Sequence, residues 1–269
     1  PSLPLSLSPL HSHSSEQVEV EHEPYSEPYY FSTERKTKIK GYLSMPVKSE
    51  TRTFNGITAV LTRDLDDKNK RVFAKDMGYY VWNDGEQSGA TPGRDVIADL
   101  MNSNATFAFL IRNPEKSIPS LDKMQKKMSD TYGQDFQQEE VGITELCDMY
   151  LYMRDILHIP SIAVVDADDV INSPEKVLPI FCEKVGLKYD ARCVHWNAET
   201  PKTWDSWAGW HDDAKNSSGF GVTTKLGTVA DVQQSESEQQ DTDRTKHVAA
   251  ALEECRSAYE TMCRDRIVC

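Results

Sequence analysis

Short apolar runs, separated by tens of residues, are the main pattern along the chain. Four of them are rich in β-branched and aromatic residues and are flanked by charged ones: residues 57–61 (ITAVL), 71–74 (RVFA), 107–111 (FAFLI) and 162–165 (IAVV). Runs of this length and composition are typical of strands, and unbroken apolar runs are typical of strands buried on both faces. The pattern therefore predicts short strands of a parallel sheet.

Apolar residues at helical spacing occupy the stretches between these runs. Residues 95–101 (DVIADLM) and 146–157 (LCDMYLYMRDIL) place apolar side chains three and four positions apart. Residues 174–185 (PEKVLPIFCEKV) begin with Pro174 and are followed by Gly186, as at the two ends of a helix. Because strands and helices alternate, we predict an α/β protein with three layers, a mostly parallel sheet flanked by helices.

Polar segments bound the predicted domain. Residues 1–21 are predicted to be an extended or disordered arm, and residues 22–269 a single domain with a flexible loop at about 215–246 and a final helix over 246–268. The first residue is proline and no basic n-region of a signal peptide follows it. Either a leading segment was removed, or the numbering starts inside a longer gene product.

Charge and composition narrow the classes of partner. The 269 residues carry a formal net charge of −13 and have a sequence pI near 5.0, which argues against nucleic acid or anionic lipid as a partner. No apolar run approaches the length of a membrane-spanning helix, so no membrane partner is expected. Residues 34–75 reverse the balance, with 11 Lys or Arg against 5 Asp or Glu. This stretch is either a solvated charged face or the place where an anionic ligand sits.

Cysteine usage predicts a cytoplasmic protein. The six cysteines form no C-x-x-C pair and show no framework spacing, which is typical of reduced thiols. Cys193 and His195 are two candidate metal ligands, but no second pair completes a tetrahedral set, and no metal site is predicted.

The clearest candidate for chemistry follows the 107–111 run. Arg112 stands at the predicted carboxyl end of this strand, where open parallel sheets bind their ligands. Its guanidinium can hold a phosphate or carboxylate through two parallel hydrogen bonds, and Ser120, on the segment that follows, can donate one more. The alternative is that Arg112 pairs with an acidic side chain of the protein, Asp166 or Asp168.

These residues form part of a family resemblance. A strand followed by Arg-Asn-Pro, with a serine eight residues after the arginine, resembles the 3′-phosphate-binding signature of sulfotransferases that use 3′-phosphoadenosine-5′-phosphosulfate. Five segments in order are similar to a fungal and bacterial branch of sulfotransferase-like proteins with a P-loop fold: residues 22–35 (HEPYSEPYYFSTER), 71–82, 107–121, 162–190 and 204–220. The resemblance implies that fold, a small-molecule substrate and 3′-phosphoadenosine-5′-phosphosulfate as the cofactor that donates sulfonate.

The resemblance also implies catalytic residues. Asp76 would accept the proton of the substrate hydroxyl while Lys75 neutralises the transferred group. His22 and Glu23, at the end of the preceding segment, would lie in the acceptor site. The alternatives are a surface ion pair for Lys75 and Asp76 and a turn hydrogen bond for His22.

Binding residues follow from the same comparison. Arg112 and Ser120 would bind the 3′-phosphate of the nucleotide. Aromatic side chains that belong either to the core or to a pocket wall on which a ring-shaped substrate stacks are Tyr25, Tyr29, Tyr30, Tyr79 and Trp82.

One part of the family pattern is missing. The chain contains no G-x-x-x-x-G-K-[ST] and no basic, serine-rich loop ahead of residue 22, and the glycine cluster 219–227 does not follow a predicted strand. Three functions therefore stay open. The first is sulfonate transfer to a hydroxyl, the second is cofactor-free acid/base chemistry on a secondary metabolite (cyclisation, dehydration or isomerisation), and the third is a non-catalytic binding protein that uses the acidic segment 231–243.

Overall fold

A computed structural model of the protein describes residues 18–48, 52–65, 70–82, 92–195, 217–220, 222–223 and 238–268. The strands are β1 (Val18–His22), β2 (Arg71–Lys75), β3 (Ala108–Ile111), β4 (Ala163–Asp166), β5 (Ser217–Gly219) and β6 (Val222–Thr223). The α-helices are α2 (Ser26–Phe31), α3 (Lys40–Ser44), α4 (Phe54–Leu61), α5 (Gly78–Val81), α6 (Pro92–Asn102), α7 (Pro114–Lys127), α8 (Ser129–Tyr132), α9 (Ile143–Leu151), α10 (Ala167–Asn172), α11 (Pro174–Val185) and α13 (Glu238–Cys263). Short 3-10 turns cover Gln138–Glu140 and Ala191–Val194, and a π-helical turn covers Tyr152–Ile156.

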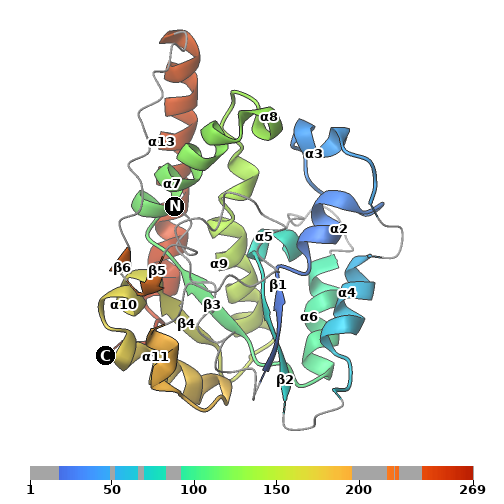
Figure 1. Ribbon diagram of the computed structural model, residues 1–269, viewed down its shortest axis with the longest axis vertical. Coiled ribbons are helices and arrows are strands. Elements are labelled where there is room, and N and C mark those ends of the chain that lie inside the picture. The colour runs from blue at the N-terminus through green and yellow to red at the C-terminus, as the bar shows by residue number, and fades with distance from the viewer. Residues whose placement is uncertain are drawn as a thin grey trace.

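Two pairs of parallel strands form the centre of the molecule (Figure 1). β1 pairs with β2 from Val18 opposite Arg71 to His22 opposite Lys75, and β3 pairs with β4 over four residues. β5 and β6 form a small antiparallel pair. The α/β class and the predicted strands at 71–74, 107–111 and 162–165 are therefore confirmed. The single mostly parallel sheet that was predicted is divided, among the described strands, into these separate pairs.

The predicted helices lie where the apolar spacing places them. α11 begins at Pro174 and ends at Val185, and it is followed by Gly186, whose φ of +70° is the left-handed conformation that glycine adopts without strain. α6 contains residues 95–101, and α9 with the π-helical turn contains residues 146–156. Local caps and spacing are enough to explain these elements.

Two predictions of secondary structure are wrong. Residues 57–61 belong to helix α4 and not to a strand, because Thr53 caps the helix by accepting a hydrogen bond from the Gly56 N–H (3.0 Å) and the buried residues Phe54, Ile57 and Thr58 follow helical spacing. The final helix begins at Glu238 and not at residue 246.

The boundary of the N-terminal arm at residue 21 also falls inside an element. Residues 18–21 are paired with β2 as part of β1, so they belong to the body of the protein. Residues 1–17, and most of the predicted loop between 215 and 237, lie outside the described residues.

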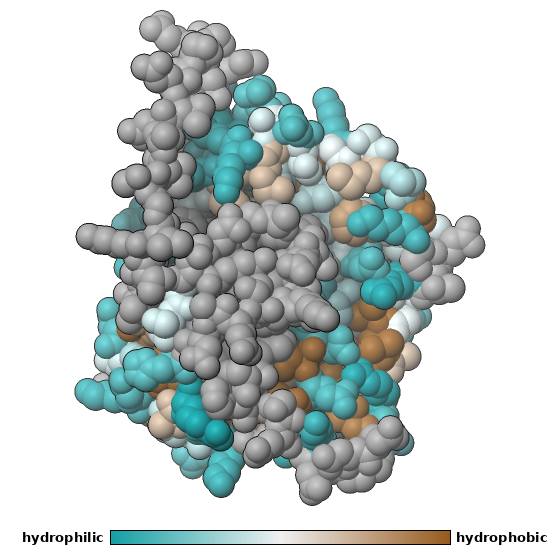
Figure 2. Space-filling model, viewed as in Figure 1, coloured by the Kyte–Doolittle hydropathy of each residue, from teal (hydrophilic) through white to brown (hydrophobic). Residues whose placement is uncertain are grey.

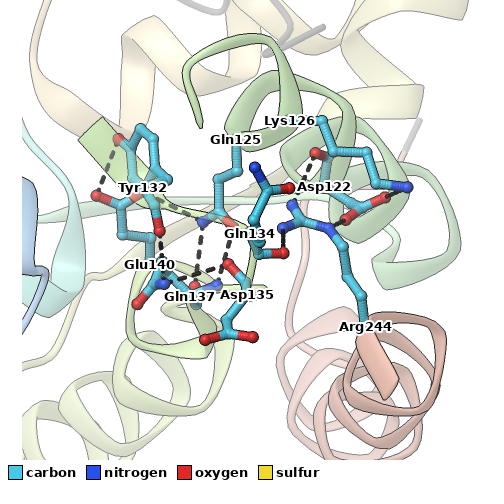
Figure 3. Close-up of polar contacts among 9 residues, drawn as sticks. All are labelled: Asp122, Gln125, Lys126, Tyr132, Gln134, Asp135, Gln137, Glu140 and Arg244. Atoms are coloured by element: carbon cyan, nitrogen blue, oxygen red, sulfur yellow. Dashed lines mark hydrogen bonds and ion pairs between the residues drawn. The ribbon is translucent and has the colours of Figure 1, made fainter. Parts of the chain in front are cut away.

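Helix α13 packs against α7 and α9. Arg244, in the first half of α13, has a side chain that is only 5% exposed. Its Nε donates to Asp122 Oδ1 of α7 at 2.6 Å and its Nη1 donates to the Gln134 carbonyl at 2.7 Å (Figure 3). Among the described residues, no helix combines the length and apolar character needed to cross a membrane.

Candidate functional site

A cavity of about 1080 Å³ is lined by residues of both strand pairs, including those at the carboxyl ends of β1, β2 and β3. Loops and helix starts converge at such ends in parallel sheets. All six residues predicted for catalysis and nucleotide binding line this cavity: His22, Glu23, Lys75, Asp76, Arg112 and Ser120. The fold therefore brings together residues that are up to 98 positions apart in sequence.

Glu23 and Lys75 form an ion pair at the ends of β1 and β2. Lys75 Nζ donates to Glu23 Oε1. The Lys75 side chain is only 23% exposed and the Glu23 side chain only 10%. The Glu23 N–H also donates to the Lys75 carbonyl (2.7 Å), which continues the strand pairing by one residue. Glu23 has a φ of +48°, which is unusual for a residue with a side chain and is maintained by these surrounding contacts.

Asp76 has a different environment from the one predicted for a base. Its Oδ2 accepts the Tyr25 N–H at 2.8 Å and its Oδ1 accepts the Met77 N–H at 3.0 Å. Burial raises the pKa of Asp76 well above its ordinary value, and the nearby Glu23 carboxylate acts in the same direction, against the two hydrogen bonds and the Lys75 charge. Asp76 thus holds the ends of β1 and β2 together, while Glu23 is the carboxylate in contact with the ammonium group.

Arg112 leaves β3 at its carboxyl end, just before α7. Burial lowers the pKa of Arg112, and the charge of Asp168 acts in the opposite direction, so the alternative in which Arg112 faces this acid has electrostatic support. Asp168 is itself bonded to Lys116 Nζ at 2.8 Å. A cationic group with reduced access to water at the mouth of a strand is suited to bind an anion through charge-assisted hydrogen bonds.

Ser120 is the seventh residue of α7 and is buried. Its Oγ is enclosed and has no hydrogen-bond partner within the described part of the chain. Buried hydroxyls are nearly always hydrogen-bonded, so this donor is suited to a ligand atom. Ser117, one turn earlier, is different because its Oγ donates to the Asn113 carbonyl at 3.2 Å.

The aromatic residues predicted for substrate binding lie in two places. Tyr25, Tyr30 and Tyr79 are buried and line the cavity. Tyr29 is completely buried in one cluster with these three tyrosines. The ring of Trp82 packs against that of Tyr152, with 5.0 Å between the ring centroids. Neither Tyr29 nor Trp82 lines the cavity. Contact with a substrate ring stays a prediction, and the burial of the tyrosines is explained by their packing against one another.

A buried carboxyl group, Glu140, was not predicted from the sequence. Its Oε1 accepts hydrogen bonds from Tyr30 Oη (2.6 Å) and Tyr132 Oη (3.2 Å). Its Oε2 accepts one from Gln125 Nε2 (3.4 Å), and Figure 3 shows Glu140 with Tyr132 and Gln125. Burial raises the pKa of Glu140 to about 7, against these hydrogen bonds. Glu140 also lines the cavity, but an acidic pair such as Glu139-Glu140 in a polar stretch is indistinguishable in sequence from an exposed turn.

Among the described residues, no group of three or more His, Cys, Asp and Glu side chains could hold a metal ion. The cationic side chains of Lys75 and Arg112 and the carboxyl groups of Glu23 and Asp76, all of which line the cavity, are suited to anion binding and proton transfer.

Comparison with known proteins gives partial matches. The chain is 27% identical over 129 residues to a branched-chain-amino-acid aminotransferase-like protein 2 of Arabidopsis thaliana and 29% identical over 131 residues to the like-named protein 1. The match covers 48% of this chain but only 21% of either relative, so the chain spans about a fifth of their length. No family model and no solved structure matches the chain.

Proposed function

We propose that the chain is a sulfotransferase-like enzyme that transfers sulfonate from 3′-phosphoadenosine-5′-phosphosulfate to a hydroxyl group of a small molecule. The observation that carries the proposal is the convergence of an acid and cation pair, Glu23 and Lys75, with Arg112 and Ser120 on one cavity. Sulfonate transfer needs a base for the acceptor, a cation near the developing charge and an anchor for the nucleotide phosphate. The resemblance of the segments around these residues supports the same assignment.

Each residue has a defined task in this proposal. Glu23 accepts the proton of the substrate hydroxyl as its oxygen forms a bond to sulfur, and the bond from sulfur to the phosphate oxygen breaks with its electron pair on the departing nucleotide. Lys75 neutralises negative charge on the transferred group. Arg112 and Ser120 bind the 3′-phosphate, and Asp76 keeps the two strand ends in place.

The fit of the nucleotide rests on Ser120. Its buried Oγ, which has no partner within the described residues, is the donor that a phosphate oxygen would use. Replacement by alanine removes one hydrogen bond to a charged group, worth about 1.5 to 3 kcal/mol. We therefore expect Ser120→Ala to weaken binding of 3′-phosphoadenosine-5′-phosphate by about 10-fold or more in isothermal titration calorimetry.

Ser117→Ala is the matched control. It removes a hydroxyl from the same helix, but one that already donates to the Asn113 carbonyl, so nucleotide affinity should change less than about 3-fold. Failure of the wild-type protein to bind the nucleotide at millimolar concentration would contradict sulfonate transfer. Equal losses in both variants would contradict the placement of the phosphate at Ser120.

A second function is supported by the proton chemistry of the same residues. Burial raises the pKa of Asp76 next to the Glu23 and Lys75 pair, and groups with shifted pKa values in a cavity are candidates for acid/base catalysis. If the nucleotide does not bind, cofactor-free isomerisation, dehydration or cyclisation is the function that these residues support.

A further inference from the structure

Hydroxyl groups of buried tyrosines link two carboxyl groups that border the cavity. Tyr80 Oη donates to Glu23 Oε2 at 3.4 Å. Tyr30 Oη donates to Glu140 Oε1 at 2.6 Å. Tyr79 lies between these two tyrosines, because its Oη is 3.1 Å from Tyr30 Oη and it also shares a side-chain hydrogen bond with Tyr80. Three hydroxyls in series, the tyrosine path, therefore join Glu23 to Glu140.

Packing holds the tyrosine path in place. Tyr30 belongs to α2, whereas Tyr79 and Tyr80 belong to α5. The three side chains are at most 5% exposed. The rings of Tyr79 and Tyr80 meet edge to face with 4.7 Å between their centroids, and those of Tyr30 and Tyr80 do so at 5.5 Å. Buried tyrosine hydroxyls need hydrogen-bond partners, and here they find one another.

The two ends of the tyrosine path have different surroundings. Glu23 is in contact with the ammonium group of Lys75, which favours the ionised form of its carboxyl group. The donors to Glu140 are Tyr30, Tyr132 and Gln125, and all three are uncharged. Burial raises the pKa of Glu140 to about 7. A proton therefore favours the Glu140 end, which gives the path a direction.

The other contacts of the Glu23 carboxyl group do not take up a proton. The Lys75 ammonium group is a donor and has no free electron pair. Apolar side chains accept no proton either, and Figure 2 shows apolar surface below the centre of the face, over the region of β1 and β2. The hydrogen bond from Tyr80 is thus the described contact through which a proton on Glu23 can move to a second carboxyl group.

Further titratable or charged groups surround the two carboxyl groups: Lys75, Asp76, Tyr42, Tyr132 and Glu139. Tyr42 Oη is 3.1 Å from Tyr132 Oη, which in turn donates to Glu140. Tyr42 is therefore a buried tyrosine of the same cluster whose hydroxyl lies on a branch beside the path from Glu23.

We propose that the tyrosine path is a route for protons, which carries to Glu140 the proton that Glu23 takes from a substrate hydroxyl. This step rests on the proposed role of Glu23 as the base. The proton passes through Tyr80, Tyr79 and Tyr30 in this order, and each hydroxyl accepts one proton and gives up its own. One proton moves, no electrons are exchanged, and every tyrosine ends neutral. Glu23 thereby returns to the ionised form that its ion pair favours.

Hydroxyl orientation couples the two ends of the path. A tyrosine hydroxyl has one hydrogen, and that of Tyr80 points to the Glu23 carboxylate. When Glu23 is neutral, this hydrogen can turn to Tyr79, and the Tyr79 hydrogen can turn to Tyr30. Hydrogen bonds in series strengthen one another, so the donation from Tyr30 to Glu140 becomes stronger. Loss of the charge on Glu23 should therefore lower the pKa of Glu140.

Carbon-13 NMR of the full chain, with glutamate labelled at Cδ, measures this coupling without a substrate. The signal of Glu140 is identified by its loss in Glu140→Gln. Glu23→Gln should lower the pKa of Glu140 by about 0.5 or more. In a Tyr79→Phe background, which keeps the ring and removes the hydroxyl, the same substitution should have less than about half of this effect. A Tyr42→Phe background should retain the effect in full.

Turnover measures the use of the path in catalysis. With 3′-phosphoadenosine-5′-phosphosulfate and benzyl alcohol, Tyr79→Phe and Tyr80→Phe should each lower kcat at least about 10-fold. Both KM values should change less than about 2-fold, because proton transfer is impaired and binding is not. Tyr42→Phe should keep the wild-type kcat.

Three results would overturn the path. One is an equal effect of Glu23→Gln on Glu140 with and without the Tyr79 hydroxyl, because the coupling would then act through space. Another is a wild-type kcat in Tyr79→Phe and Tyr80→Phe. The third is an equal loss in Tyr42→Phe, which would indicate a structural role of the whole cluster. If the wild-type protein transfers no sulfonate to benzyl alcohol, the NMR titrations decide the path, and nucleotide binding decides the proposed function separately.

Discussion

Lys75→Met is expected to lower the free energy of unfolding by about 3 kcal/mol at pH 7. The substitution leaves the Glu23 carboxylate, 10% exposed, without the ammonium group that contacts it. Removal of one member of a buried ion pair costs about 3 to 5 kcal/mol because the other charge stays desolvated, and the 23% exposure of Lys75 places the value at the lower end. Urea denaturation followed by tryptophan fluorescence measures the loss.

The partner substitution makes the prediction specific. In Lys75→Met with Glu23→Gln, both charges are absent. The loss in free energy of unfolding of the double variant should therefore be smaller, by about 2 kcal/mol, than the sum of the losses of the two single variants. Lys246→Met, in an ion pair with Asp243 whose side chains are 68% and 59% exposed, should change stability by less than about 0.5 kcal/mol. Additive effects of the Lys75 and Glu23 substitutions would show that the pair does not form.

The same variants test the proposed reaction. If Glu23 accepts the proton and Lys75 stabilises the transferred group, either single variant should release 3′-phosphoadenosine-5′-phosphate at least about 100-fold more slowly with phenolic or alcoholic acceptors. A variant that loses stability but keeps the full rate would restrict this pair to a structural role.

Glu140→Gln is expected to remove a pH dependence of stability worth about 3 kcal/mol. Burial raises the pKa of Glu140 from 4.5 to about 7, so the folded protein binds this proton more tightly than the unfolded chain. The contribution of Glu140 is therefore most favourable below about pH 4.5 and declines as the pH rises to about 7, because the unfolded chain loses the proton first. Glutamine stays neutral, and its carbonyl can accept the bonds from Tyr30 and Tyr132.

Urea denaturation at pH 5 and pH 8 measures this difference. The stability of Glu140→Gln relative to the wild type should rise by about 2 to 3 kcal/mol between these two pH values. Some dependence should remain in both proteins, because burial also raises the pKa of Asp76. Glu253→Gln, at a side chain that is 81% exposed, should retain the wild-type profile. Parallel profiles for Glu140→Gln and wild type would contradict the assignment.

Local signals predicted many elements of the fold. Short β-branched runs are sufficient for β2, β3 and β4, because a buried strand needs little more than an apolar run of the right length. Pro174 and Gly186 likewise mark the ends of α11 through their own backbone preferences. The 57–61 segment shows the limit: its β propensity is overridden by the Thr53 cap and by burial of one helical face.

The sequence indicated six polar residues that line the cavity, but it did not indicate the contacts that each of them makes. The end of the predicted 107–111 strand indicated Arg112, and the family resemblance indicated Glu23, Lys75 and Asp76. The structure places all four on one cavity. The sequence did not show that the Asp76 carboxylate would accept hydrogen bonds from two backbone N–H groups. One of them belongs to Tyr25, 51 positions away, and the other to Met77 in the turn that follows.

The sequence by itself determined the α/β class and the positions of β2, β3 and β4, because these depend on local apolar patterns, whereas β1 was predicted as part of an extended arm. Only the tertiary structure decided that Glu23 rather than Asp76 contacts Lys75, that Glu140 is buried among tyrosines, and that β2 and β3 line the same cavity. Those features depend on long-range pairing and desolvation, which arise when distant segments meet and leave no local signal in the chain.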